Sequence, residues 1–139
     1  MEMKKSVSKR RIGVIFTLIS LCSMVLTYEY YKIEQRDSTF IAIEISSIII
    51  FIVSFVLTFI NTGLWGFIHK PLKDLDEREI ILTSKSLRYA YAIFTVVTLI
   101  LLLYFAVTLT PLDVVLVAAL ILFAHLLPAS IIAWTEKVI

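Results

Sequence analysis

Long apolar stretches, each about the length of a membrane-spanning helix, dominate the chain. A spanning helix needs about 20 mostly apolar residues, and four stretches meet that requirement. They run from about residue 12 to 31, 40 to 68, 89 to 109 and 112 to 134. The pattern therefore predicts an all-α integral membrane protein, a four-helix bundle in which residues 1–139 form a single transmembrane domain.

The Lys and Arg residues are divided unevenly between the two sides of this predicted bundle. Of the 13, eleven fall in the N-terminal segment, the connection at 69–88 and the C-terminal tail, whereas Lys32 and Arg36 fall in the first connection. Positive residues are enriched on the cytoplasmic side of membrane proteins. We therefore expect a multi-pass protein of the cell membrane with both termini in the cytoplasm.

Composition narrows the class of protein further. Hydrophobic residues make up 60% of the chain and charged residues 17%, with a mean hydropathy of +0.96. A soluble domain of this size has too small a core to bury so much apolar surface. The net charge of +2 does not suggest nucleic-acid binding, and one Cys excludes a disulfide framework. No nucleophile–base spacing, phosphate loop or metal-ligand cluster occurs, so we expect no enzyme activity, no cofactor and no metal.

The connection at 69–88 is the most polar segment of the chain. Asp74 with Glu77, or Asp76 with Glu79, has the spacing of a helix cap, and no Gly or Pro follows until Pro111. We therefore expect the third helix to begin in the cytoplasm and to continue into the membrane. The segment is interpreted either as a solvated helix start or as a contact surface for a protein partner or anionic lipid. The charged residues of that candidate surface are Lys73, Asp76, Glu77, Arg78, Lys85 and Arg88.

A short motif in this connection resembles a known group of proteins. The run Asp76-Glu77-Arg78 is followed by Lys85-Ser86 and then by a hydrophobic span. This arrangement resembles small prokaryotic multi-span membrane proteins of unknown function, whose cytoplasmic connection carries an Asp-Glu-Arg run and a later Lys-Ala or Lys-Ser pair. The resemblance implies a membrane protein and no particular reaction.

A seam of polar residues follows one face of the predicted second helix. Its members, in steps of three and four, are Glu44, Ser47, Phe51, Ser54, Thr58, Asn61 and Trp65, with His69 continuing the series. A similar seam on the first helix comprises Gly13, Thr17, Ser20, Met24, Thr27 and Tyr31. Polar groups find no water in the bilayer core, so both faces should point inward. They serve either helix packing through small and hydroxylated residues or a permeation path with Glu44 as its ionisable gate.

Two further residues are candidates for chemistry inside the membrane. His125 is predicted near mid-membrane, about 21 Å along its helix from Pro111. It is interpreted as a neutral His bonded to a hydroxyl group of a neighbouring helix, or as a proton relay. Asp113 is interpreted as a cap in a helix start with Thr110 as N-cap and Pro111 next, or as an ion site. The candidate intramembrane polar site thus comprises Glu44, Ser54, Thr58, Asn61 and His125.

These patterns leave two functions in competition. The first is a non-enzymatic accessory, regulatory or immunity-type subunit that contacts a protein partner through its cytoplasmic connection. The alternative is a small homo-oligomeric transporter or channel that uses the seam of the second helix. A lipid-modifying enzyme or haem protein ranks last, because His69 and His125 are predicted at different depths. In every case the surrounding lipid is a partner.

Overall fold

Every regular element of the described chain is helical. The computed structural model describes residues 2–32 and 38–136, so Arg36 and Lys137, two of the counted basic residues, lie outside the described residues. The elements are α1 (Glu2–Tyr31), α2 (Ser38–Phe55), the π-helix η1 (Val56–Ile60), α3 (Leu64–Ile68), the 3₁₀-helix η2 (Leu72–Asp74), α4 (Glu77–Thr108) and α5 (Val114–Thr135). No strand occurs within the described ranges.

Four of the helical segments are long and apolar enough to cross a membrane. They are Val7–Tyr31, Ser38–Ile60, Glu77–Thr108 and Val114–Thr135. The prediction of an all-α chain with four such helices is therefore confirmed. Through the third span α4 runs without a break for 32 residues.

The second of these segments ends earlier than expected. The prediction of one helix over 40–68 is wrong, because the α-helical bonding of α2 gives way to η1 and the chain then turns at residues 61–63. In η1 the wider spacing is visible in the bond from Asn61 N to Val56 O, 2.9 Å long. Gly63 then adopts φ 75°, the left-handed conformation that a residue without a Cβ reaches most readily. Trp65 therefore belongs to α3, and His69 is the C-cap residue that follows it, so neither residue continues the seam of α2.

Side-chain caps set the start of α4 and of α5. Asp76 Oδ1 accepts from Glu79 N (2.7 Å), and Glu79 Oε2 accepts from Asp76 N (3.1 Å), which forms a capping box. Of the two predicted caps for this helix, Asp76 with Glu79 is thus confirmed. The predicted helix start at Thr110 is wrong: Asp113 itself is the N-cap of α5, and its Oδ1 accepts from Leu116 N (2.8 Å).

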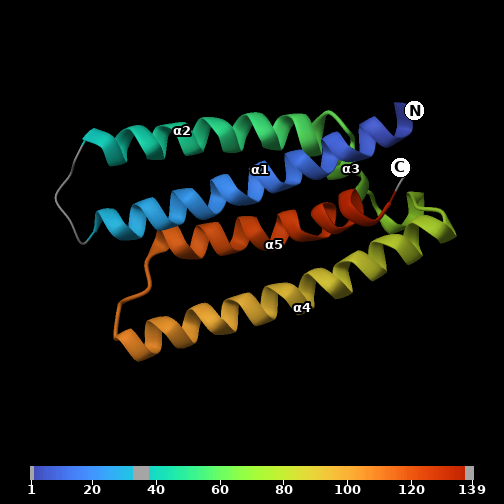
Figure 1. The fold of residues 1–139 in the computed structure, drawn as a ribbon. Coiled ribbons are helices and arrows are strands. Elements are labelled where there is room, and N and C mark those ends of the chain that lie inside the picture. Colours follow the sequence, from blue (N-terminus) through green and yellow to red (C-terminus); the bar gives the residue numbers. More distant parts are fainter. Residues whose placement is uncertain (1, 33–37, 137–139) are drawn as a thin grey trace.

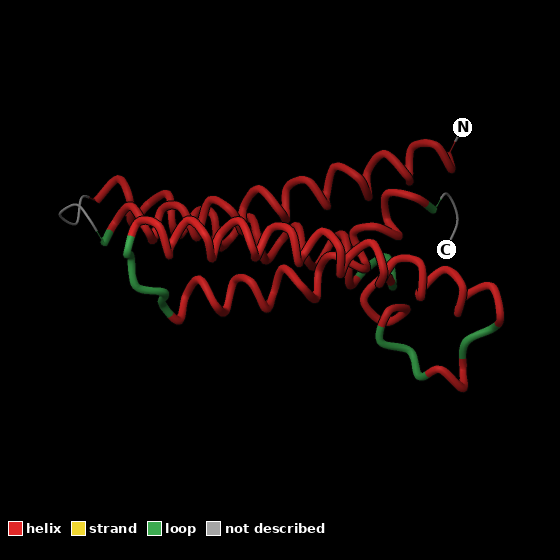
Figure 2. The backbone as a smooth tube through the Cα atoms, turned by 90° about the horizontal axis from the view of Figure 1, so that it is seen from below, coloured by secondary structure: helices red, strands yellow, loops and turns green. Residues whose placement is uncertain are grey.

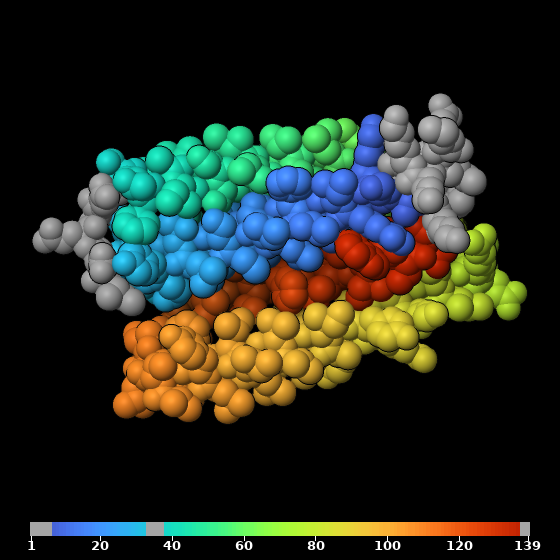
Figure 3. Space-filling view, in the orientation of Figure 1, coloured from blue at the N-terminus to red at the C-terminus, as the bar shows by residue number. Residues whose placement is uncertain are grey.

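The long helices are arranged in the order α2, α1, α5, α4 (Figure 1). The first and last helices, α1 and α5, are thus the central pair. In the space-filling view α5 shows between α1 and α4 (Figure 3). The start of α1, the finish of α5 and the connection between α3 and α4 lie at one end of the molecule, here called the terminal end (Figure 2). The α4–α5 turn lies at the opposite end, here called the far end (Figure 1).

The hydrophobic core lies where helices converge near the terminal end. It joins α1, η1, α3 and α5, and its buried members are Val14, Leu21, Phe59, Leu64, Leu126, Ala129, Ile132 and Ala133. Two small residues of α5, Ala129 and Ala133, are completely covered, which lets neighbouring elements approach its backbone there. Most of α2 and α4 instead carries exposed apolar side chains, as lipid-facing helices do.

Candidate functional site

Hydroxyl groups of α1 and α2 meet in pairs along the contact between the two helices. Thr17 Oγ1 donates to Ser54 Oγ (3.0 Å), and the Oγ atoms of Ser23 and Ser47 lie 2.9 Å apart. At Gly13 the helix backbone passes so close to Thr58 that an added Cβ would lie 1.9 Å from its Oγ1. Small residues permit this approach, and the hydroxyl pairs then satisfy one another.

The inward orientation predicted for the seam of the second helix is confirmed for its central members. Ser47, Ser54 and Thr58 are all buried. Thr17 and Ser20 of the first-helix seam are buried as well. The seam is therefore a packing surface in which one side supplies hydroxyl partners for the other.

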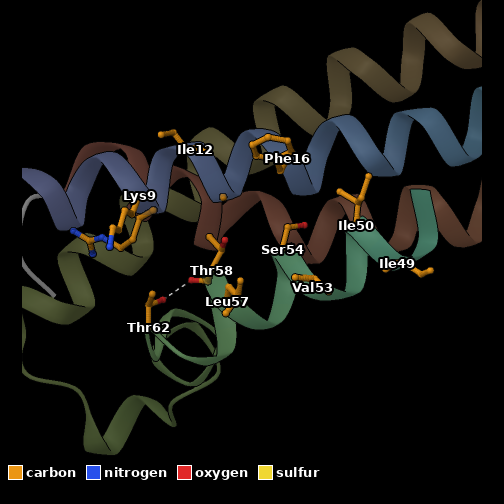
Figure 4. Close-up of a pocket in the computed structure, with 12 residues that line it drawn as sticks. Lys9, Ile12, Phe16, Ile49, Ile50, Val53, Ser54, Leu57, Thr58 and Thr62 are labelled. Carbon is orange, nitrogen blue, oxygen red and sulfur yellow. Dashed lines mark hydrogen bonds between the residues drawn. The ribbon is translucent and has the colours of Figure 1, made fainter. Parts of the chain in front are cut away.

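A groove lies beside this contact and is open along the side of the molecule (Figure 4). We call it the α1–α2 groove, and its volume is about 1040 Å³. It is lined by Lys9, Arg10, Ile12, Gly13, Phe16, Ile49, Ile50, Val53, Ser54, Leu57, Thr58 and Thr62. Lys9 and Thr62 lie toward the terminal end, whereas Ile49 and Ile50 lie toward the middle of α2 (Figure 4).

Sequence reasoning missed this groove. Lys9 and Arg10 were considered only as positive charges that indicate orientation, and Thr62 was not predicted to belong to any site. In the sequence, Lys9 precedes Gly13 by one helical turn, and Thr62 follows Thr58 by one turn. This spacing indicates that Lys9 and Thr62 lie at the same end of one groove only once the contact between Gly13 and Thr58 is known.

Glu44 lies apart from the paired hydroxyls. It is half-buried in a smaller hollow of about 310 Å³ lined by Thr27, Tyr28, Tyr31, Phe40, Ile41, Glu44 and Ile45. Its Oε2 is buried and has no hydrogen-bond partner among the described residues. Ten residues, or about 15 Å of helix, separate Glu44 from Ser54. The two members of the predicted polar site therefore lie in different hollows.

His125 and Asn61 lie on the outside of the molecule. The expectation that His125 bonds a hydroxyl group of a neighbouring helix is wrong: its ring is exposed and its Nδ1 lies 2.9 Å from Ile121 O of the same helix. Asn61 is exposed in the turn after η1. The structure thus brings together Ser54 and Thr58, and leaves Glu44, Asn61 and His125 separate from them.

Some charged residues of the 69–88 connection form ion pairs, and others are exposed to solvent. Lys70 Nζ lies 3.1 Å from Glu79 Oε2, and Arg78 Nη2 lies 3.9 Å from Glu136 Oε2. Together with the capping box at Asp76, these ion pairs link the connection to the start of α4 and to the finish of α5. Lys73, Glu77, Lys85 and Arg88 are exposed.

On α4, exposed apolar and basic side chains share one face. Ile81, Lys85 and Arg88 follow the i, i+4, i+7 spacing, and the Ile81 side chain is 62% exposed. They line a hollow of about 750 Å³ together with Ile80, Ser84, Tyr89 and Ala92. We call this surface the α4 face. It offers two positive charges and apolar area to an acidic, amphipathic partner.

An ion-pair cluster joins two connections at the far end. Lys32 Nζ lies 3.1 Å from Glu29 Oε1 and also contacts Asp113 Oδ2. Asp113 therefore caps α5 and ties it to α1. Asp113 was predicted from the sequence to be a cap or an ion site. Its pairing with Lys32 was not predicted, because that contact depends on α1 and α5 being neighbours.

The described residues contain no group of three or more His, Cys, Asp or Glu side chains placed to hold a metal ion. Comparisons with protein-family models, curated proteins and solved structures find no match to the chain. The likeness of the Asp76–Arg78 segment to small prokaryotic membrane proteins stays a prediction. The chain is accordingly characterised by its own geometry: four long apolar helices, a paired-hydroxyl contact, a groove beside it and an exposed basic face on α4.

Proposed function

We propose that this chain is a non-enzymatic protein of the cell membrane that acts as an accessory, regulatory or immunity-type subunit through its 69–88 connection. The terminal end would face the cytoplasm, with both termini there and the start of α4 projecting from the membrane. The sequence bias of Lys and Arg toward the N-terminal segment and the 69–88 connection supports this orientation. The unbroken α4, at 32 residues, is longer than the about 20 residues that span a bilayer.

The observation that carries the proposal is the α4 face. Ile81 is well exposed beside Lys85 and Arg88, near the start of α4, where a projecting helix would meet water rather than lipid. Exposed apolar area with charge at its rim is typical of protein contact sites. A partner with acidic and apolar side chains fits this surface.

The contacts around the α4 face support a preformed surface. The capping box of Asp76 and Glu79, the Lys70–Glu79 pair and the Arg78–Glu136 pair fix the start of α4 against α5 and the preceding connection. A surface that is already ordered loses less conformational entropy when it binds.

Crosslinking in native membranes tests the proposal. A photo-crosslinking residue at Ser84, between Ile81 and Lys85, should capture a partner that co-purifies with the chain. Arg88→Glu should reduce the captured partner at least tenfold, because it reverses a charge on the α4 face. Lys73→Glu reverses an exposed charge that precedes α4 in the same connection but does not line the α4 face, so it should reduce capture far less than Arg88→Glu does. Recovery of the chain alone, or equal capture by both variants, would overturn the proposal.

The transport alternative rests on one observation, the buried Oε2 of Glu44 without a hydrogen-bond partner among the described residues. The geometry favours it less, because the seam hydroxyls are used in pairs and His125 lies on the outer surface. Solute flux in proteoliposomes that Glu44→Gln abolishes would support this alternative. Flux that is absent, or unchanged by Glu44→Gln, would reject it.

A further inference from the structure

We propose that the α1–α2 groove binds one anionic phospholipid of the cytoplasmic leaflet. Its phosphate would lie at Lys9 and Arg10, and one acyl chain would follow the apolar part of the groove. The inference rests on the membrane orientation proposed above and is independent of the partner proposed for the α4 face. It assigns a ligand class to a cavity that the proposed function does not use.

Charge at the terminal end of the groove favours an anionic headgroup. Lys9 and Arg10 both line the groove: Lys9 is exposed, and Arg10 is half-buried, with its Nη2 donating to Glu136 O (3.3 Å) at the finish of α5. None of the residues that line the groove is acidic. Basic pockets between helices on the cytoplasmic side are suited to anionic headgroups, and each Lys or Arg near the surface contributes about 1 kcal/mol. A zwitterionic lipid lacks that net attraction.

The length of the apolar part matches one leaflet. Along α2 and η1 it extends from Ile49 to Thr58, nine residues or about 13 Å of helix. Half of the roughly 30 Å hydrocarbon core of a bilayer is about 15 Å. An acyl chain that begins at the level of Thr58, about one helical turn below a phosphate at Lys9, would therefore finish near the mid-plane, as the chain of a single phospholipid does.

The floor of the groove can accept an apolar chain without losing hydrogen bonds. Ser54 Oγ accepts from Thr17 and donates to Phe51 O (3.1 Å). Thr62 Oγ1 donates to Thr58 O (Figure 4). Because the hydroxyls of Ser54 and Thr62 already have partners, covering these two with hydrocarbon leaves neither donor unsatisfied. The side walls are Ile12, Phe16, Ile50, Val53 and Leu57, all apolar and open to the surrounding lipid.

Native mass spectrometry of the full chain in detergent tests the inference, with phosphatidylglycerol and phosphatidylcholine of identical acyl chains as probes. The wild-type chain should retain one phosphatidylglycerol and little phosphatidylcholine. Lys9→Gln should weaken phosphatidylglycerol binding about fivefold, which corresponds to about 1 kcal/mol. Lys73→Gln removes an exposed charge outside the groove and should have no effect.

A second pair of variants tests the acyl-chain part. Val53→Trp places a large ring in the groove and should abolish the lipid adduct. Ile52→Trp is its matched control, because Ile52 is the preceding residue, is 54% exposed against 51% for Val53, and does not line the groove. The inference is overturned if both lipids bind equally, if Lys9→Gln and Lys73→Gln behave alike, or if both Trp variants keep the adduct.

The two proposals fail in distinguishable ways. Val53→Trp should leave photo-crosslinking from Ser84 unchanged, and Arg88→Glu should leave the lipid adduct unchanged. Loss of the lipid result with retained crosslinking would reject the groove site alone. Loss of crosslinking with a retained adduct would reject the partner proposal alone.

Discussion

At Gly13, α1 comes very close to the second spanning segment. A Cβ built there would lie 1.9 Å from Thr58 Oγ1 and 3.0 Å from Thr58 Cβ, so even a methyl group has no room. Around this contact the hydroxyl pairs of Thr17 with Ser54 and Ser23 with Ser47 add directional bonds. Small size and hydroxyl pairing at single residues thus determine how α1 and α2 pack.

We expect Gly13→Ala to destabilise the protein by about 1 to 3 kcal/mol, the usual cost of overpacking a contact. Thermal unfolding in detergent, followed by circular dichroism, measures the change. Gly66→Ala is the matched control, because a Cβ at Gly66 meets nothing within 4 Å. The double variant Gly13→Ala, Thr58→Ala should regain part of the loss. Equal unfolding temperatures for Gly13→Ala and Gly66→Ala would contradict this account.

The residue scale also shows how much of the site could be read from the sequence. Hydroxylated residues stand out against an apolar background at helical spacing, so the buried faces of α1 and α2 were predictable through Thr17 and Ser54. The outward position of His125 was not, because nearly all of α5 is apolar and no polar stripe marks a face. In a helix that contacts both lipid and protein, hydrophobicity alone does not distinguish the two surroundings.

At the scale of elements, the decisive feature is the end of the second span. The helix widens into η1, turns through Asn61, Thr62 and Gly63, and resumes as α3 on the core. The sequence does contain a signal, since Asn and Gly close together are typical of turns. Apolar residues continue through Ile68, however, and they favoured one long helix over a turn. The positions of the other long helices followed from length and hydropathy.

Gly63 should be the sensitive residue of this turn. Its φ of 75° costs a residue with a Cβ about 1 to 2 kcal/mol, so Gly63→Ala should lower the unfolding temperature. Gly63→Asn should lower it less, because Asn enters the left-handed region more readily. No atom lies within 4 Å of a Cβ added at Gly63, so a steric clash does not contribute to the difference between the Ala and Asn variants. Equal losses for Ala and Asn would contradict a conformational origin.

At the scale of the whole molecule, the order α2, α1, α5, α4 places the first and last helices at the centre. Arg11 Nη2 donates to Trp134 O (2.7 Å), and its guanidinium lies 5.3 Å from the Trp134 ring centroid. This order of helices was not predictable from the sequence, because all four helices present similar apolar side chains and any two of them could pack together. Contacts such as Lys32 with Asp113 exist only because of it.

The proposed orientation predicts which residues a membrane-impermeant maleimide reaches. In a Cys22→Ser background, Thr110→Cys at the far end should be labelled in intact cells. Ser8→Cys at the terminal end should be labelled only after the membrane is opened, because the proposed orientation, which follows the bias of Lys and Arg, has that end in the cytoplasm. Both positions are exposed, so burial does not limit the reaction. Labelling of Ser8→Cys in intact cells would reject the orientation.

The central place of α5 has a consequence for synthesis. Domains begin to assemble from the N-terminus as the chain emerges, so α1 and α2 are made long before α5 is complete. Val14 and Leu21, which belong to the core with Leu126 and Ile132 of α5, must wait for the last helix to cover them. Arg11 likewise lacks its partner Trp134 until α5 has been made. A premature stop before α5 would leave the core without its central helix, so quality control can recognise the truncated product by that uncovered surface.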